Sequence, residues 1–234
     1  MEEIKIEYYF KNLDNFEHRE IFEDCTYPWE VLAKTKEYLK EKLAGAQINK
    51  AETAENCTFK GNYFIDEGTK IYPNVIIQGP VYIGKNCEIM PGAYVRPGTI
   101  TGDNVVIGFN SEVKNSVLQN GCKVASLVFV GDSILGKSAR IGSGVVTANR
   151  RFDQGNINVK VNGEVYETKS DYCGVIVGDN SRLGANVTTL PGTLIGPYTW
   201  ILPGLQVRGF VPAEKRLLPK TEYIIQDNPR MELK

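Results

Sequence analysis

The most regular feature of this sequence is an apolar residue at every sixth position. A count from Phe59 in steps of six meets apolar residues at nine of ten positions. The series is Phe59, Ile65, Ile71, Ile77, Ile83, Ile89, Val95, Thr101, Ile107 and Val113. The residue three places after each of these is Gly or Asn in eight cases, and these two residues tolerate a positive φ best. Each hexad therefore predicts a short strand with one inward side chain, followed by a tight corner.

The same period returns near the end of the chain. Its positions are Val177, Leu183, Thr189, Ile195, Ile201 and Val207. The segments MPGA, RPGT, LPGT and LPGL add a Pro-Gly pair, which a type II turn accepts at its two central positions. Stacked units of equal length cover one another's apolar side chains, so the pattern predicts a parallel β-solenoid. An antiparallel sandwich fits poorly, because its strands recur at unequal spacings of about 8 to 12 residues.

The segment between the two runs first shifts the period and then interrupts it. The apolar positions come one residue early at Leu118, Val124 and Val130, and one earlier again at Leu135, Ile141 and Thr147. We expect coils with shortened corners there. From 148 to 176 the period is lost, and NVKVNGEVYE alternates about Asn162 and Gly163, which predicts a hairpin with a two-residue turn. Residues 148–176 are therefore expected to form an arm that leaves the solenoid wall.

The two ends of the chain lack the period. IKIEYYF alternates like a strand, and PWEVLAKTKEYLKEKL repeats apolar positions at helical spacing. The helical positions are Val31, Leu32, Thr35, Leu39 and Leu43. We therefore expect a small α/β cap over the first coil at 1–52, an all-β solenoid at 53–211 and a tail without repeats at 212–234.

Composition and charge narrow the class of partner. The 234 residues are 42% hydrophobic, enough for one sizeable core, and 27 Lys and Arg nearly balance 28 Asp and Glu. No basic run indicates nucleic acid, so small molecules or other proteins are the expected partners. The five cysteines include no C-x-x-C pair, and no apolar run approaches the roughly 18 residues of a membrane span. We therefore expect free thiols and a cytoplasmic protein without membrane contact.

Only one histidine, His18, is available for chemistry. A zinc enzyme built on a solenoid would need several histidine ligands, so no metal site is expected. Ser126 lacks the G-x-S-x-G context of a serine hydrolase, and only His18 could serve as its base. We expect a structural or surface role for His18.

The segments AYVRPGTITGDNVVIGFNSEVKNSVLQNGCKVASLVFVGDSILGKSARIGSGVVTANRRFD and LPGTLIGPYTWILPG resemble the left-handed parallel β-helix of hexapeptide-repeat transferases. They are most similar to the acetyltransferase half of the bifunctional N-acetylglucosamine-1-phosphate uridyltransferase/glucosamine-1-phosphate N-acetyltransferase, and to archaeal-type sugar-1-phosphate nucleotidylyltransferases. The resemblance covers about two thirds of the chain. It implies a homotrimer, with acetyl-CoA as co-substrate in a groove between neighbouring solenoids.

The resemblance also implies a binding site for a sugar phosphate or a nucleotide sugar. Arg96 in YVRPG and Lys114 in EVKNS take the places of the phosphate-binding cations, although both also fit as solvated charges on the outer wall. Asn149 in TANRRFD takes the place of an asparagine that contacts the sugar. Arg150 follows it and either holds an anion or pairs locally, as Arg151 does if it meets Asp153.

Three further positions are implied to line the coenzyme A groove, partly through backbone groups. They are Ser143, Ala185 and Pro203. Pro203 has no N–H to donate, so one backbone contact of the family is expected to be missing.

The catalytic position departs from the family motif. That motif is Gly-His-Leu, any residue, Tyr, any residue, Gly-Asp, whereas this chain has Ser126 at the histidine and Phe129 at the substrate-binding tyrosine. Loss of a positioned base typically lowers a rate by about 10²- to 10⁴-fold. Three explanations stay open: a scaffold that only binds, a substitute base such as Asp132 or the His18 of a neighbouring chain, or an amine that is already neutral when bound.

Two functions follow from these observations. The first is acetyl transfer to an aminosugar phosphate in nucleotide-sugar metabolism. The second is a non-catalytic hexapeptide module that assembles with, or regulates, a separate nucleotidyltransferase chain.

Overall fold

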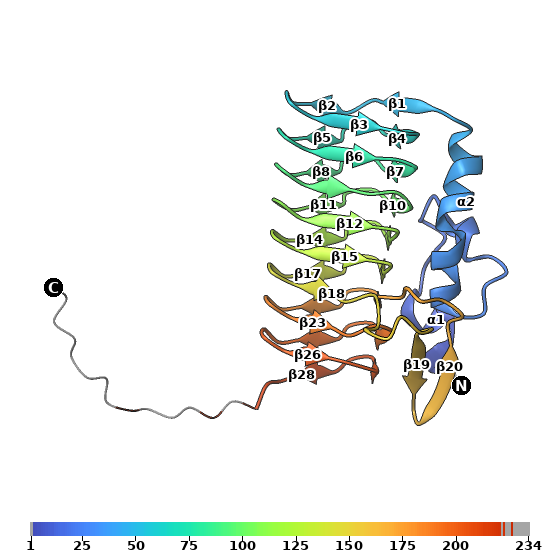
Figure 1. Ribbon diagram of the computed structural model, residues 1–234, viewed down its shortest axis with the longest axis vertical. Coiled ribbons are helices and arrows are strands. Elements are labelled where there is room, and N and C mark those ends of the chain that lie inside the picture. Colours follow the sequence, from blue (N-terminus) through green and yellow to red (C-terminus); the bar gives the residue numbers. More distant parts are fainter. Residues whose placement is uncertain (1, 221, 223–225, 227–234) are drawn as a thin grey trace.

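The computed structural model describes residues 2–220, 222 and 226, and across them the chain forms a parallel β-solenoid of three sheets (Figure 1). Sheet A contains β1 (Gln47–Asn49), β4 (Tyr63–Ile65), β7 (Val81–Ile83), β10 (Thr99–Thr101), β13 (Val117–Leu118), β16 (Ile134–Leu135), β21 (Val175–Val177), β24 (Thr193–Ile195) and β27 (Phe210–Val211). Sheet B contains β2 (Glu52–Thr53), β5 (Lys70–Ile71), β8 (Glu88–Ile89), β11 (Val106–Ile107), β14 (Lys123–Val124), β17 (Arg140–Ile141), β22 (Arg182–Leu183), β25 (Trp200–Ile201) and β28 (Arg216–Leu217). Sheet C contains β3 (Thr58–Lys60), β6 (Ile76–Gln78), β9 (Tyr94–Val95), β12 (Glu112–Lys114), β15 (Phe129–Gly131), β18 (Val146–Thr147), β23 (Thr188–Thr189) and β26 (Gln206–Val207).

The six-residue period produces the solenoid core, as predicted. The inward side chains from Ile65 to Val113 are buried, and the corner residues Asn74, Asn86 and Asn104 have positive φ. The shortened corners are also confirmed. Ile100 pairs with Tyr82 in the preceding coil and with Val117 in the next, so the second coil is one residue shorter.

The N-terminal region is helical, with η1 (Glu2–Ile4), α1 (Ile6–Tyr9), η2 (Arg19–Phe22), η3 (Pro28–Glu30) and α2 (Val31–Leu43). Helix α2 buries the five predicted positions, which confirms the helical spacing. The strand expected in IKIEYYF was wrong. It forms η1 and α1 instead, and its buried side chains, Ile4, Ile6, Tyr9 and Phe10, pack in the cluster against the solenoid rather than pairing with a sheet edge.

The position expected for this region was also wrong. It runs alongside the solenoid and covers the outer face of sheet A, rather than closing the first coil (Figure 1). The reason is the composition of that face, where outward residues such as Ile100, Val117 and Ile134 are apolar and need cover. No helix among the described residues has both the length and the apolar content to cross a membrane.

The hairpin of the arm is confirmed, with β19 (Asn158–Val161) antiparallel to β20 (Glu164–Glu167) and positive φ at Asn162 and Gly163. The arm does not stand away from the wall, because Val159 and Val161 are buried in the same cluster as the N-terminal region.

The solenoid is longer than expected at both ends. Strand β1 already pairs with β4, and β28 still pairs with β25, so strands occur before 53 and after 211. The coils at both ends depart from the period of six, which is why the sequence pattern stopped short of them. The rest of the expected tail, at 221, 223–225 and 227–234, lies outside the described residues.

Candidate functional site

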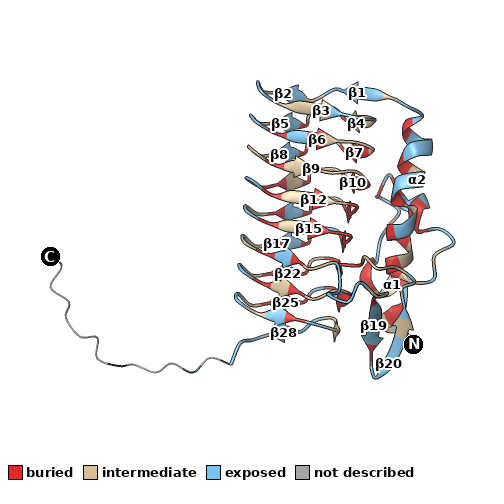
Figure 2. Ribbon diagram, viewed as in Figure 1, coloured by how far each residue is buried: buried red, intermediate tan, exposed pale blue. Residues whose placement is uncertain are grey.

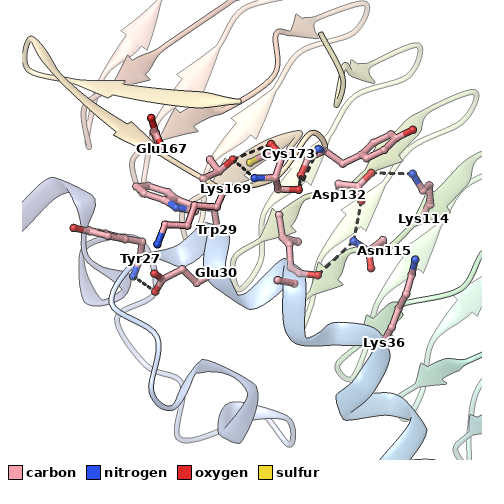
Figure 3. A pocket seen from close by; sticks show the side chains of 15 residues that line it. Tyr27, Trp29, Glu30, Lys36, Lys114, Asn115, Asp132, Glu167, Lys169 and Cys173 are labelled. Carbon is pink, nitrogen blue, oxygen red and sulfur yellow. Dashed lines mark hydrogen bonds and ion pairs between the residues drawn. The ribbon is translucent and has the colours of Figure 1, made fainter. Parts of the chain in front are cut away.

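A cavity lies between helix α2, the arm and the solenoid, at the edge where sheet C turns into sheet A. Its volume is about 710 Å³. Figure 3 shows Asp132, Lys114 and Asn115 at its solenoid end, with Trp29 and Lys169 at the other. A volume of this size falls in the range of roughly 300 to 1,000 Å³ typical of small-molecule sites.

The centre of the solenoid end is the carboxylate of Asp132, whose side chain is only 4% exposed. Its Oδ2 accepts hydrogen bonds from Lys114 Nζ at 3.1 Å and from Asn149 Nδ2 at 2.6 Å. Its Oδ1 accepts one from Asn115 Nδ2 at 2.8 Å. A buried carboxylate is costly unless it is paired and hydrogen-bonded, and here three donors satisfy it.

A further hydrogen bond connects this cluster, through Asn115, to the N-terminal region. Thr35 Oγ1 of helix α2 donates to Asn115 Oδ1 at 2.7 Å, and Asn115 in turn donates to Asp132. Thr35 is fully buried and Asn115 is 9% exposed. The helix therefore fixes the amide that fixes the carboxylate.

Tyr172, from the arm, completes the site. Lys114 Nζ lies 4.3 Å from the centre of its ring, and the Arg150 guanidinium lies 5.0 Å away. Arg150 also has Asp171 at 4.0 Å. The Tyr172 ring is therefore within cation–π distance of two cations.

Three of the sequence-predicted residues are thus brought together: Lys114, Asn149 and Arg150. Arg96 occupies the rung next to Lys114 but is paired with Glu112, so it lies in the wall as an ion pair. The local pairing of Arg151 with Asp153 is confirmed.

The remaining predicted residues lie at the opposite edge of sheet C. Ser126, Ser143, Ala185 and Pro203 stack in one column at the corner between sheets B and C, where the carbonyls of the first three each accept an amide of the following coil. Phe129 lies on β15, between the two edges. The Ser126 column presents backbone and small side chains, whereas the Asp132 cluster presents charges.

No imidazole is near Ser126. His18, the only histidine of the chain, is fully buried in the N-terminal region, with its Nδ1 2.8 Å from Tyr38 Oη. Burial lowers the pKa of His18 to about 3. The expected structural role fits this position, and a side chain buried in this way is poorly placed to serve as a base for a neighbouring chain.

Asp132 is also unsuited to replace the missing base. Both of its oxygens are occupied by the donors described above. Among the described residues no cluster of His, Cys, Asp and Glu could hold a metal ion.

Sequence reasoning missed Thr35, Asn115 and Tyr172. Thr35 was assigned to the helix core, and Asn115 looked like a corner residue with a positive φ, which it also is. Tyr172 follows a segment without periodicity. The signal that could have found Asn115 is the shortened corner, where an Asn precedes the expected position by one residue.

Comparison with known proteins places this architecture in a family. Residues 77–173 match the model of the GMPPB C-terminal domain. An uncharacterized acetyltransferase, YaiX, of Escherichia coli O6:K15:H31 (strain 536) is 35% identical, over 76% of this chain and 77% of that protein.

Two archaeal relatives are similar over a comparable part of this chain. A bifunctional sugar-1-phosphate nucleotidylyltransferase/acetyltransferase of Sulfurisphaera tokodaii is 37% identical over 79% of this chain and 45% of that protein. The bifunctional protein GlmU of Methanocaldococcus jannaschii is 37% identical over 76% and 43%. This chain spans about half the length of these two relatives.

One solved structure confirms the fold. The UDP-N-acetylglucosamine acyltransferase of Francisella novicida superposes with a TM-score of 0.52 at 19% identity, over 69% of this chain and 60% of that one. The chain therefore belongs to the hexapeptide-repeat family of left-handed β-helix transferases, and it is related to the GlmU proteins and to YaiX.

Proposed function

We propose that this chain transfers an acetyl group from acetyl-CoA to the amine of an aminosugar phosphate. The observation that carries the proposal is the buried Asp132 carboxylate, which holds Lys114 in the pocket wall and accepts a hydrogen bond from Asn149 through the same oxygen. An ammonium beside an amide suits a phosphorylated sugar, and Arg150 adds a second cation over Tyr172. A nucleotide sugar is the alternative acceptor. Arg96 would join the phosphate site only by leaving Glu112.

We assign the acetyl donor, acetyl-CoA, to a groove along the corner column of Ser143, Ala185 and Pro203. In a homotrimer this groove would be shared between two subunits. Support for self-association comes from apolar side chains left exposed on and beside sheet C. They are Ile76, Phe109, Leu127 and Val146, each at least 40% exposed. Phe109 and Leu127 are neighbours on consecutive coils, where the Leu127 N–H donates to the Phe109 carbonyl, and exposed apolar side chains grouped in this way are typical of protein interfaces.

Ser126 cannot act as a base, and both oxygens of Asp132 already accept hydrogen bonds. If the protein is catalytic, the remaining explanation is that the acceptor amine is neutral when it binds. Positioning of the amine against the thioester then supplies the rate. Under this mechanism, at pH values below the pKa of the substrate amine, the rate rises about tenfold for each unit by which the pH increases. No plateau set by a protein histidine is expected.

The first experiment is calorimetric titration of the protein with acetyl-CoA and then with glucosamine-1-phosphate. Binding of both, followed by transfer of the acetyl group, supports the proposal. Lys114→Ala is expected to weaken the binding of glucosamine-1-phosphate at least tenfold, because it removes a charge-assisted contact. Lys70→Ala, on the outer face of sheet B, is the matched control and leaves the affinity unchanged. Equal affinity in the two variants contradicts the site.

A gain-of-function variant tests the catalytic position directly. Ser126→His combined with Phe129→Tyr restores the family motif, and an increase in kcat of about 10²- to 10⁴-fold is expected if the acceptor amine reaches that corner. An unchanged kcat would place the reaction elsewhere.

The rival function is a non-catalytic partner of a separate nucleotidyltransferase chain. One observation favours it: Ser126 stands where the family motif has its histidine. Absence of coenzyme A binding, together with co-purification of such an enzyme, would decide for this rival.

A further inference from the structure

Helix α2 and the turn before it supply one wall of the cavity beside Asp132. Trp29, Ala33 and Lys36 line this wall, and their spacing of four and then three residues places them on one face of the helix. Thr35 is fully buried next to Lys36 and donates to Asn115 of the solenoid. The helix is therefore held against the solenoid in a position that presents Lys36 to the cavity.

The cations at the solenoid end of the cavity differ in whether they already have an acid partner. Lys114 Nζ lies 3.1 Å from Asp132, and Arg150 lies 4.0 Å from Asp171. Lys36 lies at the same end and is exposed (Figures 2 and 3). Within the described part of the chain, no carboxylate lies at ion-pair distance from Lys36. Its ammonium is therefore available to an anion from outside.

The remaining acids of the cavity lie toward its other end. Glu30 Oε2 accepts the backbone N–H groups of Thr26 and Tyr27, at 2.7 and 3.0 Å. Glu167 lies on the arm with Lys169, at the end of the cavity away from Lys36 (Figure 3). An anion at the solenoid end consequently meets Asp132 as the nearest acid among the described lining residues, and three donors already satisfy that carboxylate.

A free ammonium beside a paired one matches a phosphate monoester. Such a group carries about 1.5 to 2 negative charges at pH 7 and three acceptor oxygens. Lys114 has three N–H donors and gives one of them to Asp132, and its side chain is still 21% exposed. One phosphate oxygen can therefore accept from Lys36 of the helix while another accepts from Lys114 of the solenoid.

Ala33 leaves room beside this phosphate position. It is exposed and lies one turn before Lys36 on the same face of the helix. Beyond it the rings of Tyr27 and Trp29 are stacked, with centroids 4.8 Å apart. At about 1.5 Å per residue, the wall from Trp29 to Lys36 is roughly 10 Å long. This length suits one sugar ring with its phosphate.

We propose that Lys36 binds the phosphate of the ligand together with Lys114, and that the sugar ring lies along Ala33. The N-terminal region is then part of the binding site, in addition to covering sheet A. Identification of this ligand as the acetyl acceptor rests on the proposed function. The phosphate site itself does not, because it stands on the cavity, the helix face and the balance of charges.

The test is calorimetric titration of the full-length protein with glucosamine-1-phosphate and, separately, with inorganic phosphate. Lys36→Ala should weaken the binding of both at least tenfold, because it removes a charge-assisted contact. Lys36→Arg keeps the charge and should restore most of the affinity. Ala33→Leu should weaken the sugar phosphate at least tenfold and leave inorganic phosphate unchanged, because leucine fills the place of the sugar ring. Both positions are exposed and accept these good helix formers.

Lys40→Ala is the matched control. Lys40 lies one turn further along the same helix, outside the lining of the cavity, and the substitution should leave both affinities unchanged. Equal losses in Lys36→Ala and Lys40→Ala would overturn the proposal, because only the overall charge of the helix would then matter. Absence of binding by both phosphate ligands overturns it as well.

The same titrations separate this proposal from the proposed function. If Lys36→Ala keeps its affinity for glucosamine-1-phosphate and still transfers the acetyl group, the role of Lys36 is refuted and the proposed function stands. If Lys36→Ala loses phosphate binding but the natural chain transfers no acetyl group, the phosphate site stands without that function.

Discussion

The outer faces of sheets A and B share one backbone geometry and differ only in their outward residues. Those of sheet A, such as Val117 and Ile134, are apolar and lie under the N-terminal region and the arm. Those of sheet B are mostly charged and exposed, Arg140 among them. The period of six specifies the inner side chains of both sheets alike. The outward residue of each strand therefore decides whether a wall acquires a covering element or stays open to ligands.

The largest effect on stability is expected from placing a charge on the covered face of sheet A, compared with the same change on the exposed face of sheet B in the same coil. Ile134→Asp places a carboxylate under the N-terminal region without a partner, which should cost about 4 kcal/mol or more of unfolding free energy. Arg140→Asp, six residues later on sheet B, should change it by less than about 0.5 kcal/mol. Denaturant unfolding at one protein concentration measures both. Equal costs would mean that the covering of sheet A contributes nothing to stability.

The covered side also carries the strongest expected pH dependence, through His18. Tyr38 donates its proton to Glu20, so the proton between Tyr38 and His18 belongs to Nδ1, and Nε2 is a buried acceptor without a partner in the described region. A second proton on Nε2 would be a buried charge. Burial, with a smaller contribution from Lys42, accordingly lowers the pKa of His18 to about 3.

The sign of the effect follows from this depressed pKa. The unfolded chain, with a histidine pKa of about 6.5, binds the proton first as the pH falls. The stabilisation is complete above pH 6.5 or so, and about 3 kcal/mol of it should be lost between pH 7 and pH 4. His18→Phe fits among the surrounding aromatic rings and should remove this component. Urea midpoints of both proteins across that range provide the measurement, and parallel curves would contradict the assignment.

A smaller effect is expected where the covering helix meets the site. Thr35→Val leaves the buried Asn115 Oδ1 without its donor and should cost about 1 to 3 kcal/mol. Thr35→Ser keeps the hydroxyl and should restore most of this. Thr69→Val removes a comparable buried hydrogen bond far from the pocket. We expect Thr35→Val, but not Thr69→Val, to weaken the binding of glucosamine-1-phosphate as well. This difference would separate the role of Thr35 in positioning Asp132 from its contribution to stability.

The contrast between the two walls also explains which features the sequence could predict. The inner ladder from Ile65 to Val113 was predictable because a local period determines it. The hairpin at Asn162 and Gly163 was predictable because its turn chemistry is local. The Thr35 contact was not, because it joins residues 80 positions apart in sequence. Lys114 was found only through its motif, since an outward lysine on a strand looks the same whether it faces solvent or a pocket.

The smallest stability effect is expected on the open wall, where it is also the most informative. Arg182→Glu replaces the last of three adjacent cations, Lys123, Arg140 and Arg182, with an acid beside Arg140. Cross-strand pairs of opposite charge contribute roughly 0.2 to 1 kcal/mol, so the variant should be slightly more stable than the natural chain at low salt, and the gain should shrink as salt is added. Thermal unfolding at two salt concentrations measures this. A gain of stability in Arg182→Glu would show that the adjacent cations of sheet B repel one another, whereas a loss of stability would mean that they support the fold.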